Sequence, residues 1–449
     1  MLSIRTLTGA GGAVAGYLEK ESAEKDYWGK EAGRSTEWIG RGSERLGLAG
    51  AVSEEDFKNI MDGRLPDGTQ LPGGGKAGER RMGFDLTFSA PKSLSIQALA
   101  IGDQGLIDDH FEAMKAALKY AEENAAFVRV RDGEGVRLEQ TDNLAVAKFQ
   151  HQTSRNSDPQ IHGHAVVANF SHGEDKWRAI ESRELYRQKM AIGAVYRAEL
   201  AERVKARGYR IRMTNEKQGL WELEGYSKKQ LESFSSRRQE IEARLKDSTV
   251  GDSRAAERAA LQTRGKKKQL DGTGKAKLRQ EWKAQAKSLG IEVKPDKAKD
   301  LNVSAQQRAQ AAEKAVDATL KDFAGRRKPI TRQRVMGAAM ARAVGSGAKS
   351  QDVAVAIDRA VSKGKLARLD SGHLAVPPKR QSYGLASRLA YAAGAGPILK
   401  TAKIGDALAR GQGKKLTSDL GRSLSPAPLR LLSQIAKTEE EKKEKGMSV

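Results

Sequence analysis

The chain has 449 residues and no cysteine, which excludes disulfide bonds and thiolate metal sites. It has no apolar run of about 20 residues, so we expect no membrane insertion. The N-terminus lacks the apolar core of a secretory signal, so we expect the protein in the cytoplasm. The length predicts about two or three domains, and 38% hydrophobic residues suffice for their cores.

The formal net charge is +23, and most of it lies towards the C-terminus. Residues 301–449 hold 28 Lys and Arg against 12 Asp and Glu, whereas residues 1–300 carry a net charge of only +7. A basic tail that merely keeps the protein soluble is the plainer explanation. A charge of this size favours a nucleic-acid partner, and the balanced first part favours a catalytic domain.

In chain order, the first 225 residues alternate between predicted strands and helices. Strands are predicted over 1–8, 83–90, 144–151 and 161–170, helices over 11–28, 53–63, 107–127 and 183–207, and a hairpin over 208–225. Phe84, Leu86 and Phe88 alternate with polar residues, which predicts a strand with one buried face.

The rest of the chain predicts helices of decreasing regularity. Residues 227–290 are charged and helical, with a basic loop at 264–268. Residues 304–370 predict helices followed by a small hairpin, which is the order of a winged helix. Residues 377–449 contain Pro, Gly and Ser throughout, and we expect a flexible basic segment there.

Three of the six histidines gather in HQTSRNSDPQIHGHAVVANF, residues 151–170. His162 and His164 are two apart on a predicted strand and therefore share a face, while Gly163 points the other way. A loop over 152–160 can fold His151 beside them. Such a pair alone occurs by chance, but three converging imidazoles favour a metal site for Mn, Fe, Co, Ni or Zn, or for Mg when phosphate completes the shell.

A three-histidine site with open positions can ionise a water or polarise a phosphodiester for a protein nucleophile. The basic charge favours the phosphodiester. Tyr17 and Tyr27, in GYLEKESAEKDYWGK, are the candidate nucleophiles. The plainer explanation for Tyr17 is an aromatic residue of an amphipathic helix, and the residues alone favour it.

Three blocks carry a family resemblance: GRLPDG (63–68), GFDLTFSAPKS (83–93) and HQTSRNSDPQIHGHAVVAN (151–169). In this order they resemble the signature blocks of the MobF-class conjugative relaxases, the TrwC/TraI type. The resemblance implies an α/β (α+β) fold with a central antiparallel sheet, the HUH-endonuclease palm, flanked by helices.

The same resemblance implies the domain organisation. Residues 1–300 would form the relaxase domain, with a helical thumb at about 227–300. Residues 304–376 would form a winged-helix-like DNA-binding domain, and 377–449 a basic, partly flexible tail. The phosphate-binding loop of the family's helicase half has no match, because VGSGAKS (344–350) has Ala348 where glycine is needed and RGQGKKLT (410–417) has the wrong order. We therefore expect no ATP site.

Residue roles follow from the resemblance. Tyr17 matches the tyrosine that breaks the strand, and Tyr27 the second tyrosine group. His151, His162 and His164 match the metal triad. Asp85 matches the acidic residue that orients a metal histidine or takes the tyrosine proton. The chain departs from the family where paired tyrosines are usual, because Leu18 and Trp28 stand there, and at Gly163, for which we expect only a local softening of the strand.

The resemblance implies site- and strand-specific nicking of single-stranded DNA beside a hairpin at a plasmid transfer origin. The reaction would be a transesterification that leaves a 5′-phosphotyrosine and later rejoins the strand, with Mg²⁺ or Mn²⁺ as cofactor. Relaxosome proteins, a type IV coupling ATPase and its secretion system would be partners of a monomer that enters the recipient cell with the DNA. Candidate DNA contacts are Lys92, Arg155, Trp177, Arg178, Arg264, Lys266, Lys267 and Lys268.

Three alternatives stay open at this point. A rolling-circle replication initiator uses the same metal and tyrosine chemistry on a smaller domain. A catalytically inactive plasmid regulator would bind DNA only. A metal-dependent hydrolase would use water as its nucleophile.

Overall fold

The computed structural model describes residues 1–21, 36–71, 80–131, 133, 135–154, 156–246, 272–296, 303–324, 329–369 and 372–377. Tyr27, Arg155, the basic loop at 264–268 and the predicted tail after 377 lie outside these residues. The chain forms two compact units. The first comprises Met1–Val303 with Val344–Gly347, and the second begins at Ser304.

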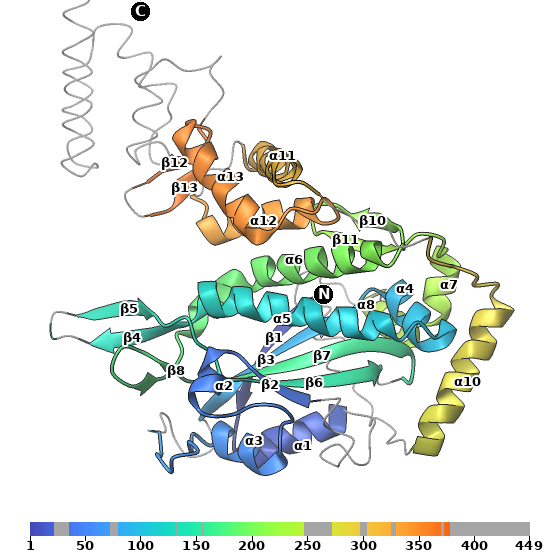
Figure 1. The fold of residues 1–449 in the computed structure, drawn as a ribbon, viewed down its shortest axis with the longest axis horizontal. Coiled ribbons are helices and arrows are strands. Elements are labelled where there is room, and N and C mark those ends of the chain that lie inside the picture. Colours follow the sequence, from blue (N-terminus) through green and yellow to red (C-terminus); the bar gives the residue numbers. More distant parts are fainter. Residues whose placement is uncertain are drawn as a thin grey trace, which may run out of the picture. The chain divides into compact units, whose positions relative to one another are not determined.

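The first unit is built on a five-stranded antiparallel sheet with strand order β1-β3-β7-β6-β2 (Figure 1). Its strands are β1 (Leu2–Thr8), β2 (Thr36–Ile39), β3 (Arg81–Ser89), β6 (Val146–Thr153) and β7 (Pro159–Ala168). The predicted mixture of helices with a central antiparallel sheet is confirmed. Strand β2 was not predicted, because it is a four-residue edge strand whose sequence, TEWI, has no distinctive pattern.

Helices cover both faces of the sheet (Figure 1). They are α1 (Gly11–Glu21), α2 (Arg41–Arg45), α3 (Glu54–Met61), α4 (Lys92–Ile96), the π-helix η2 (Gln97–Ile101), α5 (Gly105–Ala125) and α6 (Ser182–Ala206). The long helices α5 and α6 pack against each other on one face. Helices α1 and α3 lie on the other face, in one core cluster with residues of β6 and β7.

This arrangement changes the environment of β3. Phe84, Leu86 and Phe88 point towards α5 and α6, as their alternation predicted, and all three are fully buried. The prediction of an exposed second face is wrong, since Asp85 is only 1% exposed. A buried carboxylate requires hydrogen-bonding partners, and polar side chains next to Asp85 must supply them.

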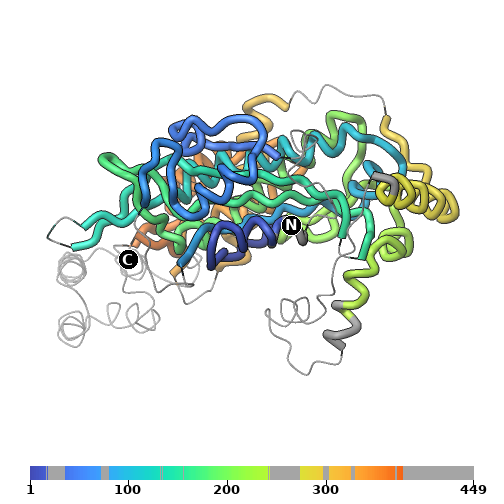
Figure 2. Tube along the Cα trace, turned by 90° about the horizontal axis from the view of Figure 1, so that it is seen from below, coloured from blue at the N-terminus to red at the C-terminus, as the bar shows by residue number. Residues whose placement is uncertain are grey.

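Among its described residues, the first unit also contains three two-stranded hairpins and three further helices. The hairpins are β4–β5 (Phe127–Arg131, Val136–Gln140), β8–β9 (Ser171–His172, Trp177–Arg178) and β10–β11 (Ile211–Asn215, Leu220–Leu223). The helices are α7 (Lys228–Ser233), α8 (Ser236–Lys246) and α10 (Gly272–Ser288), which lie together at one end of this unit (Figure 2). No helix among the described residues is both long and apolar enough to cross a membrane.

The second unit contains α11 (Ala305–Phe323), α12 (Arg332–Ala343), α13 (Ser350–Ser362) and the hairpin β12–β13 (Ala367–Arg368, Leu374–Ala375). Ser304 caps α11 through a capping box with Gln307. Ile330, between α11 and α12, forms a backbone bridge to Leu374 of β13. This bridge pairs one residue before α12 with the hairpin.

Candidate metal centre

The three predicted metal-binding histidines meet on one face of the sheet. His151 on β6 lies directly opposite His162 on β7 in the antiparallel register. The ring centroids are 5.1 Å apart for His151 and His162, 4.9 Å for His151 and His164, and 5.5 Å for His162 and His164. Strand β6 continues to Thr153 and β7 begins at Pro159, so the connecting loop is 154–158, shorter than the predicted 152–160.

Hydrogen bonds determine which nitrogen of His162 and of His164 faces the centre. His164 Nδ1 lies 2.8 Å from Asp85 Oδ2 and 2.9 Å from Asp85 Oδ1. The Thr87 hydroxyl also donates to Asp85 Oδ1 at 3.3 Å. His162 Nδ1 donates to the backbone carbonyl of Gln160 at 3.0 Å. These bonds hold the proton on Nδ1 of His164 and of His162, and they direct Nε2 towards the shared centre.

This set of donors fits a divalent metal ion. Each of the three histidines offers one nitrogen, and these atoms lie within 4.8 Å of one another. His151 and His164 are each only 4% exposed, so a bound ion would be shielded on their side. Neutral imidazoles whose outer nitrogens are held by a carboxylate or carbonyl are the usual arrangement at protein metal sites. No other such cluster occurs among the described residues.

Helix α1, which carries Tyr17, lies on the same face of the sheet as the histidines. Its residues Val14, Ala15 and Leu18 share a core cluster with Phe149 of β6, two residues before His151. The backbone of residue 17 is helical, and its side chain lies outside the described structure. The fold thus places the predicted nucleophile's helix on the metal side.

Gly163 has a packing role that the sequence did not reveal. A Cβ atom built on Gly163 would lie 2.4 Å from Met114 Sδ and 3.0 Å from Phe111 Cε1, both on α5. Real Cβ atoms essentially never lie so close to another atom, so a side chain at this position would require the flexible end of Met114 to shift. Gly163 thus lies in close contact with α5, and the expected softening of the strand stays a prediction.

Lys92, a candidate DNA contact, does not point its ammonium group into solvent. Its ammonium group is largely buried and donates to the carbonyl of Pro159 at 2.9 Å. Burial lowers its pKa to about 8, partly opposed by nearby Asp158 and Glu222. Lys92 therefore supports the start of β7.

Trp177 and Arg178 line a pocket of about 780 Å³ beside the hairpin β8–β9. Trp177 is half-buried and packs edge-on against Phe170 and His172. The Arg178 guanidinium is bonded to Asp175. Other polar residues that line this pocket are Gln70, Arg80, Arg81, Asn169 and Lys176. The combination of cations, amides and an aromatic edge suits a phosphate backbone with bases.

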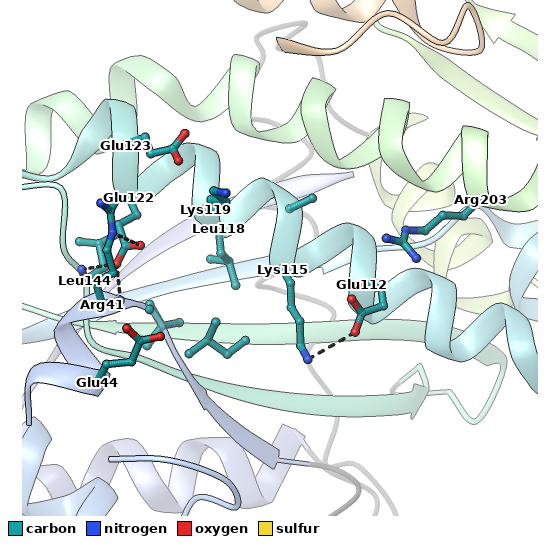
Figure 3. Close-up of a pocket in the computed structure, with 14 residues that line it drawn as sticks. Arg41, Glu44, Glu112, Lys115, Leu118, Lys119, Glu122, Glu123, Leu144 and Arg203 are labelled. Carbon is teal, nitrogen blue, oxygen red and sulfur yellow. Dashed lines mark hydrogen bonds and ion pairs between the residues drawn. The ribbon is translucent and has the colours of Figure 1, made fainter. Parts of the chain in front are cut away.

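A second pocket, of about 600 Å³, lies between α2 and α5 on the other side of β6 (Figure 3). Three of its cations are held by neighbouring carboxylates: Arg41 by Glu122, Lys115 by Glu112 and Glu37, and Arg203 by Glu199. This internal pairing leaves little net charge for an anion. Of the two pockets, the one beside β8–β9 is the better candidate for nucleic acid.

Sequence reasoning missed the residues that support the histidines. Thr87 could have been found, because it lies two residues after Asp85 and therefore on the same face of β3. The Gln160 carbonyl is a backbone group and leaves no signal in the sequence.

Comparison with known proteins places these features in a family. The family model for the TrwC relaxase matches residues 11–289. The multifunctional conjugation protein TraI of Escherichia coli strain K12 is 36% identical over 304 residues, which are 66% of this chain and 16% of that protein. A second Escherichia coli TraI is 35% identical over 307 residues, again covering 66% of this chain and 16% of the relative.

Solved structures of the relaxase TrwC are also similar to this chain. A metal-bound structure of the conjugative relaxase TrwC in complex with oriT DNA matches with a TM-score of 0.58 and 36% identity, over 65% of this chain and 99% of that one. TrwC complexed with a 27-mer DNA comprising the recognition hairpin and the cleavage site matches with a TM-score of 0.57 and 35% identity, over 65% and 99% of the two chains. This chain therefore belongs to the TrwC relaxase family.

Proposed function

We propose that the protein is a conjugative relaxase that nicks one DNA strand at a plasmid origin of transfer through a tyrosine nucleophile. The observation that carries the proposal is the position of α1, with Tyr17, on the sheet face that holds His151, His162, His164 and the Asp85 carboxylate. A tyrosine nucleophile needs a polarised phosphodiester beside it, and this face provides the groups for one.

The proposed reaction is a transesterification with no net change in the number of phosphodiester bonds. The Tyr17 phenolic oxygen attacks the scissile phosphorus, the bond from phosphorus to the 3′-oxygen breaks, and the new bond links the 5′-phosphate to Tyr17. The phenol gives up its proton and the departing 3′-oxygen gains one. The reverse reaction rejoins the strand, so no ATP is needed.

The histidines and Asp85 have separate tasks in this scheme. A bound divalent ion would neutralise charge on the non-bridging phosphate oxygens. His151, His162 and His164 would hold that ion. Asp85, whose carboxylate is bonded to His164 Nδ1, keeps this imidazole oriented and in the right tautomer. The geometry supports orientation of His164, rather than removal of the tyrosine proton, as the role of Asp85.

We propose that duplex DNA of the origin hairpin contacts the hairpin β4–β5 and the pocket beside β8–β9. Arg129 and Arg131 lie on one exposed face of the ribbon β4–β5, together with Val136 and Leu138. A two-stranded ribbon is narrow enough to enter a major groove. The TrwC structure described above was solved with a recognition hairpin, which supports this assignment.

The second unit and the wider assembly are also proposals. Three helices followed by a hairpin are the order of a winged helix, so we assign residues 304–376 to such a module. An ATP-driven helicase and the coupling ATPase would be supplied by other domains or proteins. The proposed site of action is the bacterial cytoplasm, from which the protein would accompany the DNA.

The experiment incubates the protein with single-stranded oligonucleotides from its own transfer origin and Mg²⁺ or Mn²⁺, and separates the products on a denaturing protein gel. We expect a covalent protein–DNA adduct that Tyr17→Phe abolishes. The matched control is Tyr186→Phe, since Tyr186 is 42% exposed on α6, away from the metal face. Cleavage without an adduct would favour a hydrolase, and binding without cleavage would favour an inactive regulator. An adduct on replication-origin DNA alone would favour a rolling-circle initiator.

A further inference from the structure

The loop between the two histidine strands, residues 154–158, is held from outside by α8 and α10. Trp282 of α10 is 5% exposed, and its indole N–H donates to the Ser157 carbonyl at 3.0 Å. The Ser236 hydroxyl at the start of α8 donates to the Asp158 carboxylate, and the Arg237 backbone N–H donates to it at 3.3 Å. Helices α8 and α10, which are far from the loop in sequence, therefore form hydrogen bonds with its adjacent residues Ser157 and Asp158.

The loop is also constrained from within. Ser157 has a φ of 61°, a left-handed conformation that is costly for a residue with a side chain. Asp158 is 7% exposed and accepts the Ser154 hydroxyl at 3.1 Å. Its backbone N–H donates back to Ser154 Oγ at the same distance. A turn with such a backbone conformation persists only when surrounding contacts over-determine it.

The ends of the loop lead directly to two candidate metal ligands. His151 lies three residues before Ser154, and His162 lies four residues after Asp158. The two histidines face each other across the strands, and the register shifts between His151 and Thr153. A strand pair with such an irregularity near its end can slide or twist if its turn relaxes. Displacement of the turn would change the spacing of these two imidazoles.

We propose that Trp282 and Asp158 are positioning residues for the metal centre, through which α8 and α10 set the distance between His151 and His162. The inference rests on the metal site of the proposed function. It gives α8 and α10 a task at the metal centre. Because α10 carries exposed cations, including Lys277 and Lys283, a DNA strand bound there would act on the metal site through this loop.

The test measures Mn²⁺ binding by titration calorimetry on the full chain without DNA. Trp282→Phe keeps an aromatic ring but removes the donor to Ser157 and part of the indole volume. The matched control is Trp221→Phe, since Trp221 is 2% exposed and donates its indole N–H to the Arg197 carbonyl at 3.3 Å, far along the chain from the loop. We expect Trp282→Phe to weaken Mn²⁺ binding about threefold to tenfold, and Trp221→Phe to leave it within about twofold.

Two further measurements separate positioning from general damage. Amide hydrogen exchange over 152–160 should accelerate in Trp282→Phe and not in Trp221→Phe. Ser236→Ala removes the hydroxyl that donates to Asp158. It should also weaken Mn²⁺ binding, which keeps the inference testable even if Trp282→Phe folds poorly. Equal Mn²⁺ affinity in Trp282→Phe, Ser236→Ala and Trp221→Phe would overturn the inference. Absence of Mn²⁺ binding in the unmodified protein would overturn the metal site itself, and nicking by that protein would then have to be explained without it.

Discussion

Asp85 Oδ2 lies 2.8 Å from His164 Nδ1, and both side chains are almost completely buried. The bond fixes the orientation of His164 and leaves Nε2 directed at the metal centre. We predict that Asp85→Ala weakens Mn²⁺ binding about tenfold to a hundredfold, as measured by calorimetry. Asp109→Ala is the matched control, because Asp109 is another buried carboxylate, bonded to Arg207 instead of a histidine. A similar loss of Mn²⁺ affinity in both variants would show that Asp85 acts only on stability.

The tight contact of Gly163 with α5 leads to a stability prediction. Gly163→Ala should lower the free energy of unfolding by about 1–3 kcal/mol, because the new methyl group overlaps Met114. The additional change Met114→Ala should offset part of the overlap, so the double variant should lose less than the two single losses combined. Thermal or urea unfolding measures these differences.

Gly12→Ala on α1 is the control for this prediction, because a Cβ there meets no atom within 4 Å. It should be neutral or slightly stabilising, since alanine favours a helix more than glycine does. If Gly163→Ala is as harmless as Gly12→Ala, the close packing of β7 against α5 is not a constraint on the sheet.

Substitutions in the two pockets should differ in their effect on the salt dependence of DNA affinity. Lys176, exposed beside β8–β9, would contact a phosphate, whereas Lys119 lines the pocket between α2 and α5. Lys176→Gln should make the dependence of log affinity on log salt shallower by about 0.7–0.9, the effect of one lost phosphate contact. Fluorescence anisotropy with origin DNA at several salt concentrations measures the slope. Lys119→Gln should leave this slope unchanged. A shallower slope in Lys119→Gln but not in Lys176→Gln would assign the DNA to the pocket between α2 and α5 instead.

A buried histidine outside the metal site predicts acid sensitivity. His110 lies fully buried between α5 and α6, with Nδ1 2.7 Å from the Tyr196 hydroxyl. Burial is the main cause that lowers its pKa from 6.5 to about 3, so below pH 6.5 the unfolded chain binds a proton that the folded protein refuses. The free energy of unfolding should therefore fall by about 2 kcal/mol between pH 6.5 and pH 5 on account of His110.

His110→Gln tests this assignment, because glutamine can still bond to Tyr196 but does not titrate. Urea unfolding at pH 5 and pH 7 should show a smaller difference for the variant than for the unmodified protein. An unchanged difference would assign the acid sensitivity to other groups.

The sequence allowed the centre of the site to be predicted and much less of its surroundings. Alternation along β7 placed His162 and His164 on one face, because a strand's period of two is a local property. The role of Asp85 came from the family resemblance, and its position opposite β7 comes from the folded sheet. The contact of Gly163 with Met114 depends on how closely α5 approaches β7, which no local pattern encodes. Trp282 lies 125 residues from Ser157, so only the folded chain reveals that they are bonded.

The assignment of Tyr17 as the nucleophile can be tested at the level of a single residue. Trypsin cleavage after Arg5, Lys20, Lys25 and Lys30 separates the two candidate tyrosines: Tyr17 falls in the peptide 6–20, and Tyr27 in the peptide 26–30. The covalent adduct formed with origin DNA is isolated, digested with trypsin and nuclease, and analysed by mass spectrometry. We expect a nucleotide phosphate attached to Tyr17 in the peptide 6–20. Attachment only in the peptide 26–30, or cleavage of the DNA with no modified peptide, would contradict it.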